Sequence, residues 1–395
     1  MSYFDHASTS HPKDPRVIDA LVEAMGAAGS PGRGTHGGAR RAEAGLQRAR
    51  ERARALLGTT RGEVSFTLNA TDALNLALKG FLRPGDEVVT TQVEHNSVLR
   101  PLRGMQRRHG LRLKVVPCDD AGRVSLEALR RAIGLRTRLV VIAHASNVTG
   151  ALQPVAELGR WLRAKSPAPR LLVDAAQTAG YRDLREVSDV ADLIAVAGHK
   201  GPGGPAGTGF LWRRSEVRLT PLREGGTGGS SESLHQPTVP PHDLEAGTQN
   251  YPGIVGLSEA IRIRLEEHGL GAVRRARTEF TRRFLEVIGE FESVRCWGPC
   301  DPSAREPVFP LQVRGMSVEE AGVLLELHAG ITQRGGLHCA PGIHQALGTG
   351  EEGALRWSFG PFPGDKEIRR SRDTLRVLTS AFEAGPRTRG TKEEE

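Results

Sequence analysis

The chain has 395 residues, of which 38% are hydrophobic and 25% are charged, with 48 glycines and a formal net charge of +8. This composition is typical of a globular, loop-rich protein with two lobes and excludes a disordered chain. Its positive charge comes from scattered arginines, and aromatic residues make up only 5%, so we expect no nucleic-acid binding.

The sequence also lacks the marks of secreted and membrane proteins. No basic N-terminal region precedes an apolar stretch, and no run of about 18 apolar residues predicts a membrane span. The four cysteines, at positions 118, 296, 300 and 339, are too few and too scattered for a disulfide framework or a metal site. We therefore expect a cytoplasmic protein with no membrane partner and no metal.

Short apolar strands alternate with helical stretches from about residue 60 to residue 215. The expected strands are 64–68, 87–93, 111–116, 139–144, 171–174, 193–197 and 207–212. The expected helices are 72–81, 125–133, 155–164 and about 181–188. This alternation predicts an α/β fold built on a mainly parallel seven-stranded sheet that is covered on both faces.

A second unit follows a long irregular stretch at 222–250, whose length indicates a functional or interface loop. A helical pattern from 256 to about 288 leads to a small α+β lobe, against which the N-terminal residues could pack. In that lobe strands are expected at 309–313, 331–333 and 355–359, a capped helix begins at Ser317, and a closing helix covers 366–382. We place the large domain at 16–255, the small domain at 1–15 and 256–385, and a disordered tail at 386–395.

Polar residues gather at the ends of the predicted strands, namely Asn69, His95, Asn147, Asp174 and Lys200. Ligands of parallel sheets bind beyond the carboxyl ends of the strands, so we expect these residues to form one site. An amine at one strand end and a carboxylate at another suit pyridoxal phosphate (PLP): Lys200 can bond its aldehyde, and Asp174 can keep its ring nitrogen protonated. A lone lysine at a strand end is usually a solvated turn residue, so the inference depends on matching segments elsewhere.

Seven segments, in order, resemble one known family. They are Asn69-Ala-Thr-Asp-Ala-Leu-Asn75, Glu94-His-Asn96, Ser146-Asn-Val-Thr-Gly150, Asp174-Ala-Ala-Gln177, Gly198-His-Lys200, Glu245-Ala-Gly-Thr248 and Arg334-Gly-Gly-Leu-His-Cys-Ala-Pro341. The chain resembles PLP-dependent enzymes of the class V aminotransferase fold, and within them the group II cysteine desulfurase/selenocysteine lyase family. The resemblance covers nearly the whole chain and implies the PLP-dependent transferase fold type I.

The resemblance implies a set of cofactor contacts. His95 would stack on the PLP ring, and Gln177 and Asn147 would lie near its phenolic oxygen. His199 would reach the phosphate. Thr227 would reach the phosphate of a neighbouring subunit, which implies a homodimer; the alternative is that Thr227 lies in a mobile surface loop.

Ala70 and Thr71 stand where a strand meets the start of a helix, and the free amides and dipole there favour a phosphate. The plainer alternative for Thr71 is an ordinary helix N-cap. In the small lobe, the donor fork of Arg356 suits bidentate binding of an amino-acid carboxylate, and Arg334 is expected near the site. Either arginine could instead form a surface ion pair.

Cys339 decides between chemistries within this fold. It is predicted to lie on a short turn before a helix that begins near Gly342, with His338 and Arg334 as its basic neighbours. Nearby positive charge favours a thiolate and makes it nucleophilic. The alternative is a small buried apolar residue, the usual role of a lone cysteine.

Three positions depart from the family pattern: His6 replaces asparagine, Ala197 replaces a serine, and Gly335 replaces threonine or alanine, which is expected to loosen the cysteine loop. The implied activity is that of a homodimeric cysteine desulfurase, which converts L-cysteine to L-alanine and leaves a persulfide on Cys339 for an acceptor protein. Lys200 would be its general base. The alternatives are a selenocysteine lyase, transaminase or epimerase that does not need Cys339, and a non-catalytic scaffold.

Overall fold

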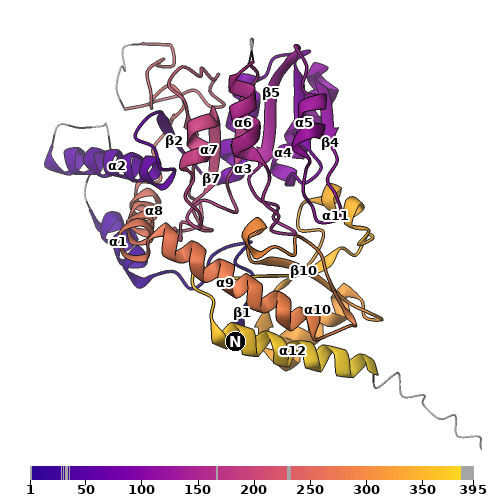
Figure 1. Cartoon of the computed structure of the whole chain (residues 1–395). Coiled ribbons are helices and arrows are strands. Elements are labelled where there is room, and N and C mark those ends of the chain that lie inside the picture. The colour runs from indigo at the N-terminus through magenta and orange to yellow at the C-terminus, as the bar shows by residue number, and fades with distance from the viewer. Residues whose placement is uncertain are drawn as a thin grey trace, which may run out of the picture.

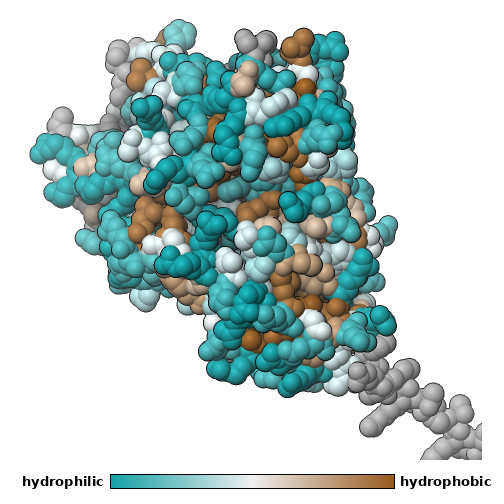
Figure 2. All heavy atoms as spheres, in the orientation of Figure 1, coloured by the Kyte–Doolittle hydropathy of each residue, from teal (hydrophilic) through white to brown (hydrophobic). Residues whose placement is uncertain are grey.

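The computed structural model describes residues 2–27, 29, 31, 34, 36–165, 168–228 and 233–383, so the expected tail at 386–395 lies outside the described residues. In Figure 1 the large sheet and helices α3 to α7 form the upper part of the molecule, and α9, α10 and α12 lie below it. The face shown in Figure 2 is mainly hydrophilic, with hydrophobic side chains in scattered patches. No helix among the described residues is long and apolar enough to cross a membrane.

The large sheet has seven strands in the order β2-β8-β7-β6-β5-β3-β4. Their bounds are β2 (Glu63–Thr67), β3 (Glu87–Thr91), β4 (Arg112–Val116), β5 (Thr137–Ala143), β6 (Arg170–Asp174), β7 (Leu193–Ala197) and β8 (Gly209–Arg213). Only β8 runs antiparallel to its neighbours, β2 and β7. The predicted mainly parallel seven-stranded sheet is therefore confirmed.

Alternate residues of these strands bury themselves on opposite faces of the sheet, as the period of a strand requires. Val88 and Leu139 pack in the same core as α3 (Ala70–Phe81) and α4 (Asn96–His109). Their chain neighbours Val89 and Val140 pack in the core that contains residues of α6 and α7. Helices α5 (Leu126–Ala132), α6 (Val155–Arg163) and α7 (Arg185–Val190) lie close to their predicted positions.

Three helices escaped the sequence prediction, namely α1 (Pro15–Gly26), α2 (Gly37–Leu56) and α4. The buried face of α2 consists mainly of alanine and glycine, which give little hydrophobic contrast. Helix α4 is rich in arginine and carries Pro101 in its interior, so its short apolar stripe of Val98, Leu102 and Met105 is easily overlooked.

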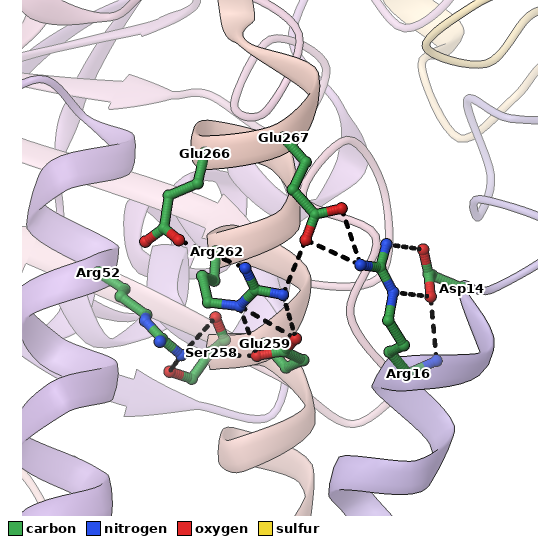
Figure 3. Close-up of polar contacts among 8 residues, drawn as sticks. All are labelled: Asp14, Arg16, Arg52, Ser258, Glu259, Arg262, Glu266 and Glu267. Carbon is green, nitrogen blue, oxygen red and sulfur yellow. Dashed lines mark hydrogen bonds and ion pairs between the residues drawn. The ribbon is translucent and has the colours of Figure 1, made fainter.

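The helical pattern at 256–288 does not form one continuous helix. It consists of α8 (Tyr251–Arg262), a π-helical segment (Ile263–His268) and α9 (Leu270–Gly289). Gly269 separates them with a φ of 69°, a conformation that favours glycine. Figure 3 shows Arg262 bound to Glu259, Glu266 and Glu267, and Glu267 bound in turn to Arg16 of α1.

The small lobe contains a second, antiparallel sheet in the order β12-β13-β10-β9. Its strands are β9 (Val294–Cys296), β10 (Val308–Val313), β12 (Arg334–Gly336) and β13 (Ala354–Ser358). Helices α10 (Val318–Ala329), α11 (Pro341–Leu347) and α12 (Asp365–Glu383) follow or separate them. The predicted capping box of Ser317 and Glu320 is present at the start of α10.

The N-terminal segment packs on this lobe, as expected. Strand β1 (Ser2–Tyr3) pairs in parallel with β11 (Ile331–Thr332), and Phe4 joins an aromatic core with Trp357 and Phe359. The small lobe thus has a core of its own. The residue limits of the two domains stay a prediction.

A buried ion cluster joins the two lobes. The carboxylate of Glu306 accepts hydrogen bonds from Arg182, which follows β6, and from Arg277 of α9. Arg277 also donates to the carbonyl of Phe359 at 2.7 Å, directly after β13. The cluster therefore fixes the end of β13 relative to the large sheet.

Candidate active site

A cavity of about 280 Å³ lies beyond the carboxyl ends of the central strands, between the two lobes. The predicted residues that line it are Ala70, Thr71, His95, Asn147, Asp174, Gln177, His199, Lys200, Arg334 and Arg356. The structure therefore brings together side chains that the sequence placed at separate strand ends. Of the remaining predicted residues, Cys339 lies beside the cavity and Thr227 lies elsewhere.

Lys200 and Asp174 share the base of this cavity. Burial lowers the pKa of Lys200 to about 8, and the charge of Asp174 opposes that change. Burial raises the pKa of Asp174, against a hydrogen bond of 2.9 Å from the Ala176 amide and the charge of Lys200. The cavity thus holds an amine that can lose its proton near neutral pH, next to a buried acid.

The plainer alternative, that Thr71 is the N-cap of α3, is wrong. Asn69 caps that helix, with its Oδ1 accepting from the Asp72 amide at 2.9 Å. The Thr71 hydroxyl instead lies 2.7 Å from the hydroxyl of Ser97. Because Asn69 serves the helix, Thr71 can face a ligand at the helix start.

Ser97 also fixes the ring of His95, a role that the sequence did not indicate. Nδ1 of His95 accepts from the Ser97 amide at 3.0 Å and lies 2.8 Å from its hydroxyl. Burial lowers the pKa of His95 to about 4, with Lys200 adding to the effect, so the ring is neutral at physiological pH. A neutral, fixed ring suits stacking on a flat ligand.

The N-terminal segment holds the peptide group that precedes Lys200. The carbonyl of His199 accepts from the Ser10 amide at 2.9 Å, the Ser10 hydroxyl at 3.0 Å and Lys13 Nζ at 2.9 Å. The ring of His199 lies 3.1 Å from the Thr9 hydroxyl, and burial lowers its pKa to about 4. These contacts fix the backbone from which the Lys200 side chain extends.

Arg356 lies in the middle of β13, with its side chain buried. Its Nη2 donates to Asp5 at 2.8 Å and to the Ser8 hydroxyl at 2.7 Å, and its Nη1 donates to the Asn147 carbonyl at 3.1 Å. Its Nε is buried and has no partner in the described residues. Asp5 and Ser8 were not among the predicted site residues.

Two amide side chains of the cavity contact the surrounding backbone. Gln177 donates to the carbonyl of Ala7 at 3.1 Å, and Asn147 donates to the carbonyl of His338 at 2.8 Å. Each amide group carries a second N–H. Through these contacts Gln177 links the cavity wall to the N-terminal segment, and Asn147 links the wall to the cysteine loop.

Cys339 lies on a turn between β12 and α11, near the predicted position. Both His338 (φ 49°) and Cys339 (φ 58°) adopt left-handed backbone conformations, which are uncommon for residues other than glycine and are found at functional sites. The half-buried thiol lies 3.5 Å from Nη2 of Arg334. The predicted positive neighbour is therefore present.

His338 does not add to that positive charge, contrary to expectation. Its Nε2 lies 2.9 Å from the Ala354 carbonyl, and burial lowers its pKa to about 2. The ring is therefore neutral and holds the turn against β13. Arg334 alone of the two flanking residues can stabilise a thiolate on Cys339.

Thr227 lies apart from the Lys200 cavity of its own chain. It lines a separate small pocket together with Glu245 and Arg50, which form a buried ion pair of 2.6 Å. This position agrees with a role outside its own site. Its contact with a partner subunit stays a prediction.

The three departures from the family pattern have different surroundings in the structure. Ala197 packs with Ala70 and Ala176 and lines the cavity, and His6 is half-buried with its pKa lowered to about 3 by desolvation. Gly335 lies in β12 opposite Leu355, and a Cβ there would come within 2.7 Å of a Val318 methyl group. The missing side chain of Gly335 therefore allows close packing with α10, and its effect on the cysteine loop stays a prediction.

Comparisons with known proteins agree with this geometry. Residues 2–370 match the family model described as Aminotransferase class-V. A probable cysteine desulfurase of Methanothermobacter thermautotrophicus is 32% identical over 95% of this chain and 94% of its own length. The cysteine desulfurase IscS of Vibrio cholerae is 31% identical over 97% of this chain and 93% of its own length. The apo structure of a cysteine desulfurase from Thermococcus onnurineus NA1 superposes with a TM-score of 0.87 at 32% identity, covering 97% of this chain and 95% of that chain.

Proposed function

The chain belongs to the class V aminotransferase family, and we propose that it is a PLP-dependent cysteine desulfurase that carries the sulfur as a persulfide on Cys339. One observation carries this proposal: a thiol beside Arg334 stands at the edge of a cavity that contains Lys200 and Asp174. Relatives named cysteine desulfurase over nearly their whole length support the activity. Membership in group II stays a prediction.

The residues of the cavity fit PLP. The small side chains of Ala70, Ala176 and Ala197 leave room for a flat ring, and His95 is fixed as a neutral stacking partner. Asp174 would pair with the ring nitrogen, and Gln177 and Asn147 would lie near the phenolic oxygen. The start of α3, with Thr71, and the ring of His199 would hold the phosphate.

When bound, PLP supplies an electron sink that stabilises negative charge at the substrate Cα. Lys200 would take up and return the Cα proton, because a pKa near 8 suits a base that works close to neutral pH. Arg356 would bind the substrate carboxylate with its guanidinium group. That cation is already bound to Asp5, so the substrate would share it with the N-terminal segment.

Cys339 would then take the sulfur atom. Its thiolate attacks the sulfur of the substrate, so that an S–S bond forms while the C–S bond breaks and its electron pair stays on carbon. The carbon fragment takes up a proton and becomes L-alanine, and the enzyme keeps the persulfide. Arg334 stabilises the thiolate before the attack.

Some parts of the proposal reach beyond one chain. We propose a homodimer in which Thr227 completes the phosphate site of the partner, a persulfide-accepting protein as the next reactant, and a cytoplasmic location. The position of Thr227 outside its own cavity supports the first of these.

The activity is tested with a panel of amino acids. The purified protein should be yellow, should release L-alanine from L-cysteine, and should show little turnover of amino acids that lack sulfur or selenium. Borohydride should fix the cofactor on Lys200, as peptide mass mapping would show. Labelling of another lysine, or preferred transamination or epimerisation of other amino acids, would overturn the proposal.

A further inference from the structure

A second hollow, larger than the Lys200 cavity, lies beside the cysteine loop. Its volume is about 730 Å³, and α4, the end of β4 and the start of α11 surround it. We call it the basic groove and define it by Asn96, Arg100, Arg103 and Arg107 of α4 and by Pro341 and Gly342 of α11. The sequence predicted no site role for any of these residues.

The basic groove adjoins the backbone of Cys339. The amide of Asn96 donates to the carbonyl of Cys339 at 2.7 Å. Pro341, which begins α11, follows Cys339 by two residues and also lines the groove. A molecule lying in the groove would therefore be next to the turn that carries the thiol.

Helix α4 presents three arginines to the groove. Arg100, Arg103 and Arg107 are spaced by three and four residues, so they share one face of the helix, and all are exposed. The segment 96–109 contains no aspartate or glutamate. Within the part of the chain that the structure describes, none of the three has a carboxylate at ion-pair distance.

Several other helical arginines of this protein contact carboxylates of the same chain. Arg262 contacts Glu259, Glu266 and Glu267, as Figure 3 shows, and Arg282 contacts two glutamates of its own helix. Cations at a helix C-terminus are favoured by the helix dipole, which accounts for Arg107 in the last turn. It does not account for Arg100 and Arg103, which lie earlier in α4.

We propose that the basic groove docks an acidic segment of the protein that accepts sulfur from Cys339, a proposal that rests on the proposed function. Arginines that line a hollow without a carboxylate partner attract and orient a negatively charged molecule. The thiolate of the docked acceptor attacks the outer sulfur of the Cys339 persulfide. One S–S bond forms as another breaks, Cys339 leaves as a thiolate, and no outside oxidant or reductant is needed.

The test compares two double variants with the same change of charge. Arg103→Gln/Arg107→Gln alters the groove and spares Arg100, whose charge acts on His95. Arg274→Gln/Arg275→Gln on α9 is the control, since both residues are exposed and neither lines the groove. The probe is a peptide with a run of glutamates and one cysteine, and its counterpart carries glutamines instead.

Sulfur transfer from L-cysteine to each peptide is followed by mass. For the glutamate peptide, the groove variant should need about fivefold more peptide for half-maximal transfer, the combined effect of two exposed ion pairs. The control variant and the glutamine peptide should show no such change, and high salt should remove the difference. L-Alanine formation with a small thiol as acceptor should be unchanged.

Several results would overturn the docking site. One such result is unchanged sulfur transfer to the glutamate peptide in the groove variant. Another is an equal loss of activity in that variant when a small thiol replaces the peptide as acceptor. A change of oligomeric mass in the groove variant would show that a second copy of this chain covers the groove. If the groove variant bound RNA less well than the unaltered protein but transferred sulfur to the peptide equally well, the partner would be a nucleic acid and not a protein. Failure of the unaltered protein to form L-alanine from L-cysteine would instead overturn the proposed function.

Discussion

Glu306 offers a direct test of how the two lobes are held together. Its side chain is only 2% exposed, and its carboxylate is shared by Arg182 and by Arg277, which donates at 3.0 and 2.7 Å. Glu306→Gln keeps the shape of the side chain and one acceptor oxygen but removes the negative charge. Two largely buried cations then lose their counter-charge.

Removing one partner of a buried ion pair costs about 3–5 kcal/mol. Because glutamine can still accept a hydrogen bond, we expect the lower end, a loss of about 3 kcal/mol in the free energy of unfolding. Although burial acts in the opposite direction, the two arginines hold the pKa of Glu306 below its ordinary value of 4.5. A depressed carboxyl pKa stabilises the folded state above that value, so the difference between wild type and variant should shrink as the pH falls below about 4.5.

Urea unfolding followed by circular dichroism measures this loss, with Glu292→Gln as the control. Glu292 is exposed, and its substitution should change the free energy by less than about 0.5 kcal/mol. A loss below about 1 kcal/mol in Glu306→Gln, or equal losses in both variants, would refute the idea that this cluster joins the lobes.

Three further predictions concern the site itself. Mixing Thr227→Ala with Lys200→Ala subunits should restore activity through heterodimers with one intact site; no recovery would place Thr227 in its own subunit's site. Arg356→Lys should raise the KM for L-cysteine about tenfold with a smaller effect on kcat, because lysine cannot bind a carboxylate with two parallel hydrogen bonds, and an unchanged KM would contradict this role. Burial lowers the pKa of His95 to about 4, so its ring stays neutral above that pH. The pH–rate profiles of the wild type and of His95→Gln should therefore not differ by a titration step near pH 6.5, and such a difference would contradict this prediction.

The sequence predicted the parts of the fold that depend on local pattern. The apolar runs that end at Asp174 and near Lys200 gave the buried strands β6 and β7 almost to the residue, because both faces of these strands are covered. The strand-end rule then brought Asp174 and Lys200 into one cavity. Helix α4 was missed, since its arginines conceal a short apolar stripe.

Contacts between distant segments could not be predicted in the same way. Asp5 reaches Arg356 across 351 residues, and the carbonyl of His199 is held by Ser10 across 189 residues. The neutrality of His338 likewise depends on its burial against the Ala354 carbonyl, which only the folded small lobe provides.

The central claim is that Cys339 receives the sulfur. After one turnover with L-cysteine, alkylation and peptide mass mapping should find a persulfide on Cys339. Cys339→Ser should still bind PLP and respond spectrally to L-cysteine, yet form little L-alanine, because a hydroxyl is far less ionised than a thiol and a poorer nucleophile. Full turnover of L-cysteine by Cys339→Ser, or a persulfide on Cys118, Cys296 or Cys300 instead, would contradict the mechanism.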